Sequence, residues 1–422
     1  MDLQYLIAML ICITAVASFI NNRYIHLPKA IGLTIFTLFL SLGIMSLLAI
    51  GQYWVLPIKA FLGGINFNAT VMDGMISYLL FAGALHINAA ELIPYKKVII
   101  SLATTSVLIS CFLIGYFVWT ATRFLHVPMD FLSCLLFGAL IAPTDPVCVL
   151  SAMKNSRTPQ SIRMKITGES IFNDAAGILL FFVIVQLIEG KTYAFSYGKT
   201  LWLLVWQGGG GILLGYSLGI FVSYFLRRTR DAHTAVLMTL AVVTGGYSVA
   251  TFIKVSGPIC MVLAGLVIGS QCRKTHFTKS IVSGLYNFWG LIDGMLNSCL
   301  FVLIGLELLT IDTRIVSLIV GAIAFFIIIL TRIVSVTIPT VLFESIKSLK
   351  NWRMLSVMTL GGMRGGLSIA LALSIPDSNQ YKSTIIGITY TVVVFSIILQ
   401  GLSLQHFVNY IFPEQKTTEE AE

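Results

Sequence analysis

The chain has 422 residues, of which 57% are hydrophobic and only 11% are charged, and its mean hydropathy is +0.91. This composition leaves too little polar surface to coat a soluble globule, so it predicts an integral membrane protein. The net charge of +9 comes from basic residues spread over many short loops, which favours topology-setting charge and argues against nucleic-acid binding.

Thirteen apolar windows are long enough to cross a bilayer, which takes about 18–25 residues each. The first window has no basic n-region and no small-residue cleavage site, so we expect a spanning helix and not a removable signal. We therefore predict an all-α membrane protein with thirteen transmembrane helices. The windows are 3–20, 30–50, 67–88, 98–121, 130–153, 167–188, 200–226, 234–253, 257–272, 282–309, 315–341, 354–375 and 383–410.

The basic residues alternate between rich and poor loops along this series, as the positive-inside rule requires. With the N-terminus outside, eighteen of the 27 Lys and Arg residues fall in cytoplasmic loops and seven fall on the other side. The remaining two, Arg332 and Arg364, lie within spans. One missed or invented helix would reverse the pattern after it. The sequence therefore predicts thirteen crossings of the cell inner (plasma) membrane, with the C-terminus in the cytoplasm.

Several charged residues lie inside predicted spans, where a charge costs roughly 2.5–3.5 kcal/mol and calls for a partner or a function. The candidates are Asp145, Glu169, Asp174, Asp293, Arg332 and Arg364. Asp73 and Glu307 lie nearer the outer ends of their helices, so we expect them to reach toward water. His86 is expected to be a packing residue. The seven cysteines indicate neither a disulfide framework nor a metal site.

The fifth and sixth windows place two acids at one depth. Asp145 lies nine residues before Lys154, and Asp174 lies nine residues after Lys165. At about 1.5 Å per residue, both carboxylates lie roughly 13 Å from the loop between the two helices. Two adjacent antiparallel helices are therefore predicted to present two acids near the membrane midplane.

The fifth window is predicted to be broken at Pro143-Thr144-Asp145-Pro146. A proline inside a helix removes a backbone hydrogen bond and clashes with the preceding turn. Broken helices at mid-depth are tolerated where the freed backbone groups line a polar cavity, and such half-helix ends form ion sites. The alternative is a simple proline kink.

The sixth window carries one polar arc that divides into two neighbouring strips. Glu169 and Asn173 form one strip, and Ser170 and Asp174 form the other. We assign Ser170 and Asp174 to a cavity shared with Asp145. Glu169 and Asn173 are assigned to structural pairing with an arginine.

The twelfth window contains "GGMRGG", in which four glycines flank Arg364. Each glycine weakens a helix by roughly 1 kcal/mol relative to alanine, although helix packing by small residues is an alternative explanation. A buried cation there can neutralise exposed carbonyl ends. Helices five and twelve are seven apart, and an odd offset inverts orientation. We therefore predict inverted six-helix repeats, with helix seven as the connector and with helices five and twelve crossed and partly unwound.

Oxygen ligands from Asp145, Asp174, Ser170 and Thr144 suit a hard monovalent cation such as Na+, Li+ or K+. Desolvation and like charge favour the protonated form of such a carboxylate, so it can hold a proton near neutral pH. It then either holds the proton or coordinates the cation. That exclusivity predicts a secondary antiporter and not an enzyme, with no cofactor beyond the transported ions.

The motifs "APTDPV", "GESIFND" and "GGMRGG" together resemble the monovalent cation:proton antiporter-1 family, in its NhaP-like sodium/proton antiporter branch. The resemblance covers essentially the whole chain. It implies Asp174 as the main cation and proton carrier, assisted by the three other oxygen ligands. Asn173, in place of a second aspartate, suggests one-for-one, electroneutral exchange. For Glu169 the family favours Arg332 as partner, which leaves Arg364 for the crossed helices.

The resemblance also implies a homodimer in which a mobile core moves against a dimerisation domain. The expected divisions are 1–92 and 231–311 for dimerisation, 93–190 and 312–412 for the core, 191–230 as a linker helix and 413–422 as a short cytoplasmic tail. Asn88 stands where many relatives carry an acid. A K+/H+ antiporter, a cation channel and, more remotely, an intramembrane hydrolase remain as alternatives.

Overall fold

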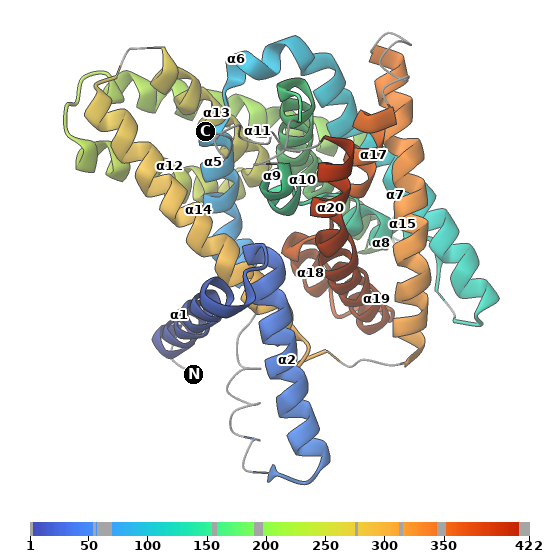
Figure 1. Cartoon of the computed structure of the whole chain (residues 1–422). Helices are drawn as coiled ribbons and strands as arrows, with labels where there is room; N and C mark the ends of the chain where they lie inside the picture. The colour runs from blue at the N-terminus through green and yellow to red at the C-terminus, as the bar shows by residue number, and fades with distance from the viewer. Residues whose placement is uncertain are drawn as a thin grey trace, which may run out of the picture.

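The computed structural model describes residues 3–53, 56, 70–127, 129–153, 158–189, 197–274, 277–311, 315–343 and 352–412, and the predicted tail 413–422 lies outside them. Within these ranges the regular elements are helices (Figure 1). Their bounds are α1 Leu3–Ile20, η1 Asn21–Ile25, α2 Lys29–Ala49, η3 Thr70–Met75, α5 Ile76–His86, α6 Ala89–Leu92, η4 Ile93–Tyr95, α7 Lys96–Phe124, α8 Phe131–Ile141, α9 Val147–Met153, α10 Gln160–Glu189, α11 Tyr197–Leu226, α12 Ala232–Phe252, α13 Gly257–Arg273, α14 Lys279–Glu307, α15 Ile315–Phe343, α17 Trp352–Leu360, α18 Gly366–Leu373, α19 Lys382–Phe395, η6 Ser396–Gln400 and α20 Gly401–Ile411.

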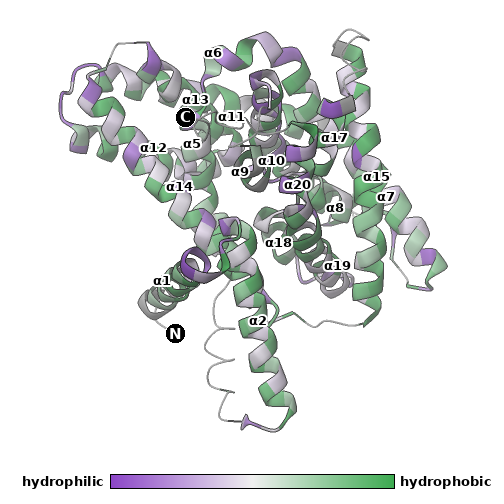
Figure 2. Cartoon of the chain, in the orientation of Figure 1, coloured by the Kyte–Doolittle hydropathy of each residue, from purple (hydrophilic) through white to green (hydrophobic). Residues whose placement is uncertain are grey.

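The outside of the molecule is apolar, as a bilayer requires. Nine helical segments in the described ranges are long and apolar enough to cross a membrane. Large hydrophobic side chains such as Phe39, Leu213 and Phe326 are exposed, and Figure 2 shows hydrophobic residues along α2 and α15. Lipid tails are the solvent that such a surface needs. The prediction of an all-α, multi-pass membrane protein is therefore confirmed.

The four other predicted spans correspond to short or interrupted helices. These are η3 with α5, α8 with α9, α13, and α17 with α18. The breaks at α8–α9 and α17–α18 divide apolar stretches into pieces shorter than a bilayer crossing. For this reason helix length alone does not establish the number of crossings, and thirteen stays a prediction.

The helices pack as two sets. In the first, α7 packs against α8, α10 and α15, and α15 packs against α19. In the second, α13 packs against α5, α11 and α12, and α14 packs against α2, α5 and α12. Figure 1 shows α12 to α14 on one side and α7, α15 and α17 on the other, with α9 and α10 between them. Helices α10, α14 and α18 bring the two sets into contact.

Loop chemistry fixes where individual helices begin. Asp231 caps α12, because its carboxylate accepts hydrogen bonds from the backbone amides of His233 and Thr234. The Thr234 hydroxyl also donates to it, and these bonds hold the pKa of the Asp231 carboxyl below its usual value. Ser256 caps α13 in the same way, one residue before the Gly257-Pro258 pair.

Two sequence-based placements are wrong. Glu307 is buried at the end of α14 and accepts a hydrogen bond of 2.7 Å from the Thr310 hydroxyl, so it does not reach toward water. The Ser41 hydroxyl of α2 donates to the carbonyl of Gly305, which shows that α2 covers this end of α14.

Lys165, counted as a loop residue, lies in α10 and is buried, with Nζ above the ring of Tyr95. The Asp73 side chain lies outside the described part of the chain.

Candidate functional site

The two interrupted helices meet at their breaks. Between α8 and α9 the chain runs extended, and the backbone amide of Asp145 donates to the carbonyl of Met363 at 2.8 Å. Met363 lies in the matching break between α17 and α18. Gly365 approaches so closely that a Cβ there would lie 2.7 Å from Oδ2 of Asp145. The prolines and glycines that open the two helices thus bring the two openings together.

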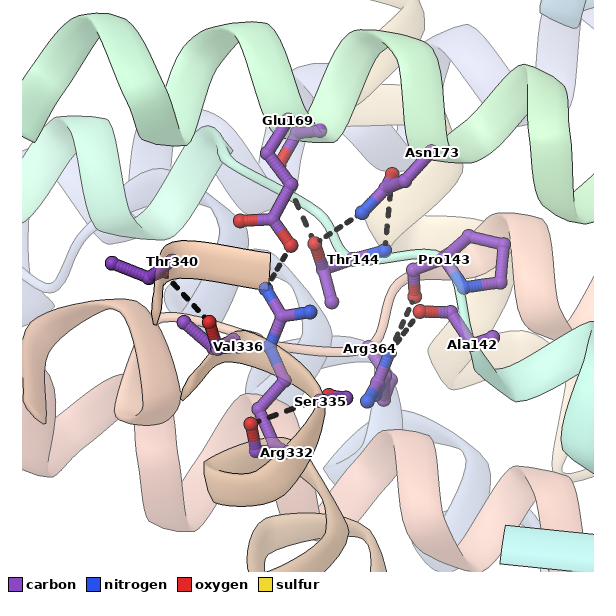
Figure 3. A network of polar contacts seen from close by, with 11 residues as sticks. Ala142, Pro143, Thr144, Glu169, Asn173, Arg332, Ser335, Val336, Thr340 and Arg364 are labelled. Carbon is purple, nitrogen blue, oxygen red and sulfur yellow. Dashed lines mark hydrogen bonds and ion pairs between the residues drawn. The ribbon is translucent and has the colours of Figure 1, made fainter. Parts of the chain in front are cut away.

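Arg364 satisfies the carbonyl groups that the first break leaves free. Its Nη1 donates to the carbonyl oxygens of Ala142 at 2.5 Å and of Pro143 at 2.9 Å, as Figure 3 shows. These carbonyls follow the C-terminal end of α8, where the helix dipole is negative. The guanidinium is 1% exposed, so its charge acts in a dry environment. The backbone amide of Arg364 donates to Ser396 Oγ at 2.9 Å, which links the break to η6.

A second buried arginine lies beside the site. Arg332 of α15 forms an ion pair with Glu169 of α10 (Figure 3). The two side chains are 4% and 2% exposed. The structure therefore places Arg332 against Glu169, as the family resemblance favours, while Arg364 lies at the helix break.

Asn173 differs from its sequence-based assignment. It was grouped with Glu169 for pairing with an arginine, but its Nδ2 donates to Thr144 Oγ1 at 2.8 Å and its Oδ1 accepts from the Thr144 amide at 3.5 Å (Figure 3). Ser170 Oγ also lies 3.5 Å from Thr144 Oγ1. The structure therefore corrects the role of Asn173. The amide ties α10 to the unwound segment, because the freed amide and hydroxyl of Thr144 offer it both a donor and an acceptor.

A cavity of about 530 Å3 reaches the two acids, and both Asp145 and Asp174 line it. Asp145 Oδ1 accepts a hydrogen bond of 2.9 Å from the backbone amide of Val147, which orients its carboxylate. Within the described ranges no hydrogen bond or ion pair engages the carboxylate of Asp174. Thr144 also lines the cavity, whereas buried Ser170 does not and contacts the site through Thr144.

The donor set limits what the site can hold. Two carboxylates and a hydroxyl supply hard oxygen ligands, which suit an alkali cation or a proton. No set of three or more His, Cys, Asp or Glu side chains in the described residues could hold a metal ion. The oxygen atoms that this site presents therefore suit a small, hard cation or a proton.

Other polar residues, which the sequence motifs do not assign to cation binding, line the same cavity. Its lining includes Asp293 and Asn297 of α14 and His86 of α5. Asp293 is a charged residue within a predicted span. Its sequence position alone does not show whether its side chain lies on the face of α14 that borders the cavity. His86 bonds the Ala82 carbonyl at 2.7 Å and the Tyr286 carbonyl at 3.3 Å, as a packing residue would.

We expect Gly365→Ala to impair cation binding through Asp145. The added Cβ would press on the carboxylate, and overpacking of this kind costs about 1–3 kcal/mol. If the carboxylate moves, that cost corresponds to roughly a fivefold to hundredfold loss of cation affinity. Isothermal titration of the purified protein with NaCl measures it. Gly245→Ala in α12 is the matched control, since a Cβ there meets nothing within 4 Å among the described residues. Equal affinities in the two variants would contradict the expectation.

Comparison with known proteins gives a consistent result. The family described as "Sodium/hydrogen exchanger, transmembrane" matches residues 6–410. The Na(+)/H(+) antiporter NhaP of Pseudomonas aeruginosa is 37% identical, with 97% of each chain covered. The Na(+)/H(+) antiporter NhaH of Halobacillus dabanensis is 29% identical, covering 96% of this chain and 95% of the relative. The structure of the sodium proton antiporter MjNhaP1 from Methanocaldococcus jannaschii at pH 8 has a TM-score of 0.76 at 20% identity, covering 98% of this chain and 100% of that one.

Proposed function

The chain belongs to the sodium/hydrogen exchanger family and is a cation/proton antiporter, not an enzyme, and from this premise we propose that it exchanges Na+, and also Li+, for H+ at Asp174 and Asp145. The observation that carries the proposal is the Asp174 carboxylate, which lines the cavity and is free of protein partners in the described residues. A free carboxylate in a cavity binds either a proton or a cation. The two relatives named above carry Na(+)/H(+) antiporter in their names, which supports Na+ as the substrate.

Asp174 is the carrier in this scheme, and the other oxygen ligands complete the site. Asp145 coordinates the cation from the unwound segment, together with the Thr144 hydroxyl, and Ser170 assists through its contact with Thr144. When a proton neutralises Asp174, the carboxylate loses the charge that holds the cation. Cation and proton therefore compete for one place, and no separate cofactor is needed.

Alternating access requires that the loaded site faces each side of the membrane in turn. We propose that 93–190 and 312–412 form the moving core, that 1–92 and 231–311 form the stationary dimerisation domain, and that 191–230 links them. The packing of the helices in two sets supports this division. In this scheme Glu169–Arg332 and Arg364 keep the core rigid, because they join α10 to α15 and the end of α8 to the break after α17.

The topology follows from the same proposal. Thirteen crossings in inverted six-helix repeats, with the broken helices five and twelve crossed, place the N-terminus outside and the C-terminus in the cytoplasm. The two breaks that meet at Asp145 and Met363 support the repeat. We place the protein in the plasma membrane as a homodimer. Sodium tolerance and pH homeostasis are the physiological tasks that such an exchanger would serve.

We further propose one-for-one, electroneutral exchange. Asn173 is neutral and is bonded to Thr144, so it adds no second titrating acid beside Asp174. A carrier with one exchangeable charge moves either Na+ or H+ in each direction. The membrane potential then has no net charge to act on.

Proteoliposomes test the function directly. An inward Na+ gradient is expected to drive protons outward, with the same initial rate whether or not valinomycin and K+ clamp the voltage. Li+ is expected to substitute for Na+. Proton movement with K+ alone would assign the chain to K+/H+ exchange. Conductance without obligatory proton counterflow would contradict antiport and favour a channel.

A further inference from the structure

Asp293 places a third carboxylate in the transport cavity. It lies near the middle of α14, whereas Asp145 and Asp174 come from the α8–α9 break and from α10. All three line the same cavity of about 530 Å3. Asp145 and Asp293 are near enough to interact electrostatically across it. The acids therefore approach the cavity from two different sets of helices.

The contacts of Asp293 leave one of its two carboxylate oxygens without a hydrogen bond in the described residues. Its Oδ1 accepts a hydrogen bond of 3.0 Å from Asn297, one turn further along α14. Arg273, the cation that lines the cavity, donates to the backbone carbonyls of His86 and Ile87 instead. His86 interacts with Asp293 electrostatically, but its two ring nitrogens contact the carbonyl oxygens of Ala82 and Tyr286 and form no hydrogen bond with the carboxylate. No ion pair joins Asp293 to a basic residue in the described part of the chain.

The remaining acid of the lining, Glu91, is occupied elsewhere. Its two carboxylate oxygens accept hydrogen bonds from Asn88 at 2.6 Å and from Gln160 at 2.7 Å. Glu91 lies in α6, which follows α5 in the chain and packs against α13. Besides Asp145 and Asp174, the lining therefore has one carboxylate, Asp293, with an oxygen free of hydrogen bonds in the described residues. That oxygen can interact with a cation in the cavity.

We propose that Asp293 is a specificity-determining residue of the transport cavity, a stationary carboxylate that draws the monovalent cation toward Asp145 and Asp174 without carrying it or its proton. This inference rests on the proposed function. The carboxylate attracts cations into a confined, partly apolar space, where a unit charge acts more strongly than in open water. It repels anions from the same space.

The position of Asp293 on α14 makes its effect depend on the membrane face. In the proposed mechanism α14 belongs to the stationary domain, so Asp293 faces the carrier acids only while the site is open to this cavity. When the core moves, Asp145 and Asp174 move away from the electrostatic field of Asp293. The cavity lining includes Asn88, Glu91 and Arg273, which lie at the cytoplasmic ends of their spans in the proposed topology. Asp293 therefore raises cation affinity at the cytoplasmic face and favours release at the other.

Asp293→Asn is the isosteric test. Its apparent KM for Na+ is expected to rise about threefold to tenfold at the cavity-open face, because one attracting charge is lost. The maximal rate should change by less than about twofold, since the carriers are untouched. Exchange is measured in everted and in right-side-out membrane vesicles, so that each face is presented to Na+ in turn. Asp293→Glu restores the charge and should restore the KM.

A matched control and a salt series separate charge from structure. Asp377→Asn removes an exposed carboxylate outside the cavity and should leave KM unchanged. Raising ionic strength with choline chloride should raise the wild-type KM more than that of Asp293→Asn, because screening acts on the charge that the variant lacks. A purely structural role would give the same salt response in both proteins.

Direct binding distinguishes failure of this inference from failure of the proposed function. NaCl titrated into detergent-solubilised wild-type protein should bind, and should bind more weakly to Asp293→Asn. Equal affinity and equal KM at both faces would overturn the role of Asp293 and leave the exchange proposal standing. Equal losses at both faces would overturn the stationary position of the carboxylate. Wild-type protein that neither binds nor exchanges Na+ would overturn both proposals.

Discussion

Asp174→Asn is expected to abolish cation/proton exchange. The substitution preserves the shape of the side chain but removes the group that binds the proton and the charge that binds the cation. Both half-reactions are lost together, so we expect the initial rate in proteoliposomes to fall by at least about 100-fold, as for loss of an essential proton-transfer group. Because Asp174 has no partner in the described structure, insertion and folding should be retained.

Asp231→Asn is the control for the carrier variant, because Asp231 is an exposed acid at the start of α12, far in the chain from the site. It should exchange ions at the wild-type rate. Size-exclusion chromatography of both variants checks that they are folded. If Asp174→Asn kept a pH-dependent cation uptake, another residue would have to be the carrier.

Glu169→Ala and Arg332→Ala are each expected to destabilise the folded protein. Either change leaves its former partner charged, buried and unpaired, which costs roughly 3–5 kcal/mol. Folded yield and the thermal melting temperature in detergent should fall clearly. The Na+ affinity of the protein that does fold should change little, because neither residue lines the cavity.

The double variant tests whether the two residues act as one unit. Removing both partners leaves no unpaired charge, so Glu169→Ala with Arg332→Ala should be no less stable than either single variant. Additive losses would show that each residue is stabilised by different neighbours. The same four proteins, compared by melting temperature, complete the double-mutant cycle.

The elements and the breaks of this fold were accessible to sequence reasoning, because they follow from local rules. Long apolar windows give helices, and the two prolines around Asp145 and the glycines around Arg364 interrupt them where expected. Helical rise placed Asp145 and Asp174 at one depth, and both indeed line one cavity. The number of crossings was not accessible from helix length, because the breaks themselves shorten the helices.

Side-chain partners were harder to predict, because they depend on contacts between distant segments. The helical face of α10 groups Asn173 with Glu169, yet the two turn to different partners, Thr144 and Arg332. The freed backbone of the unwound segment offers Asn173 both hydrogen bonds, which no periodicity within α10 reveals. Glu307 lies at a helix end and was expected in water, but α2 packs over that end. The direction of Asp293 likewise depends on how α14 packs.

The central claim is that one pocket holds either a cation or a proton. The most direct test is the number of protons released when Na+ binds to the purified protein. Isothermal titration with NaCl near neutral pH, in buffers of different ionisation enthalpy, is expected to show about one proton released per Na+ bound when Asp174 starts out protonated. Asp174→Asn should show no linked release. Saturable Na+ binding to the wild-type protein with no proton release at any pH would contradict the account.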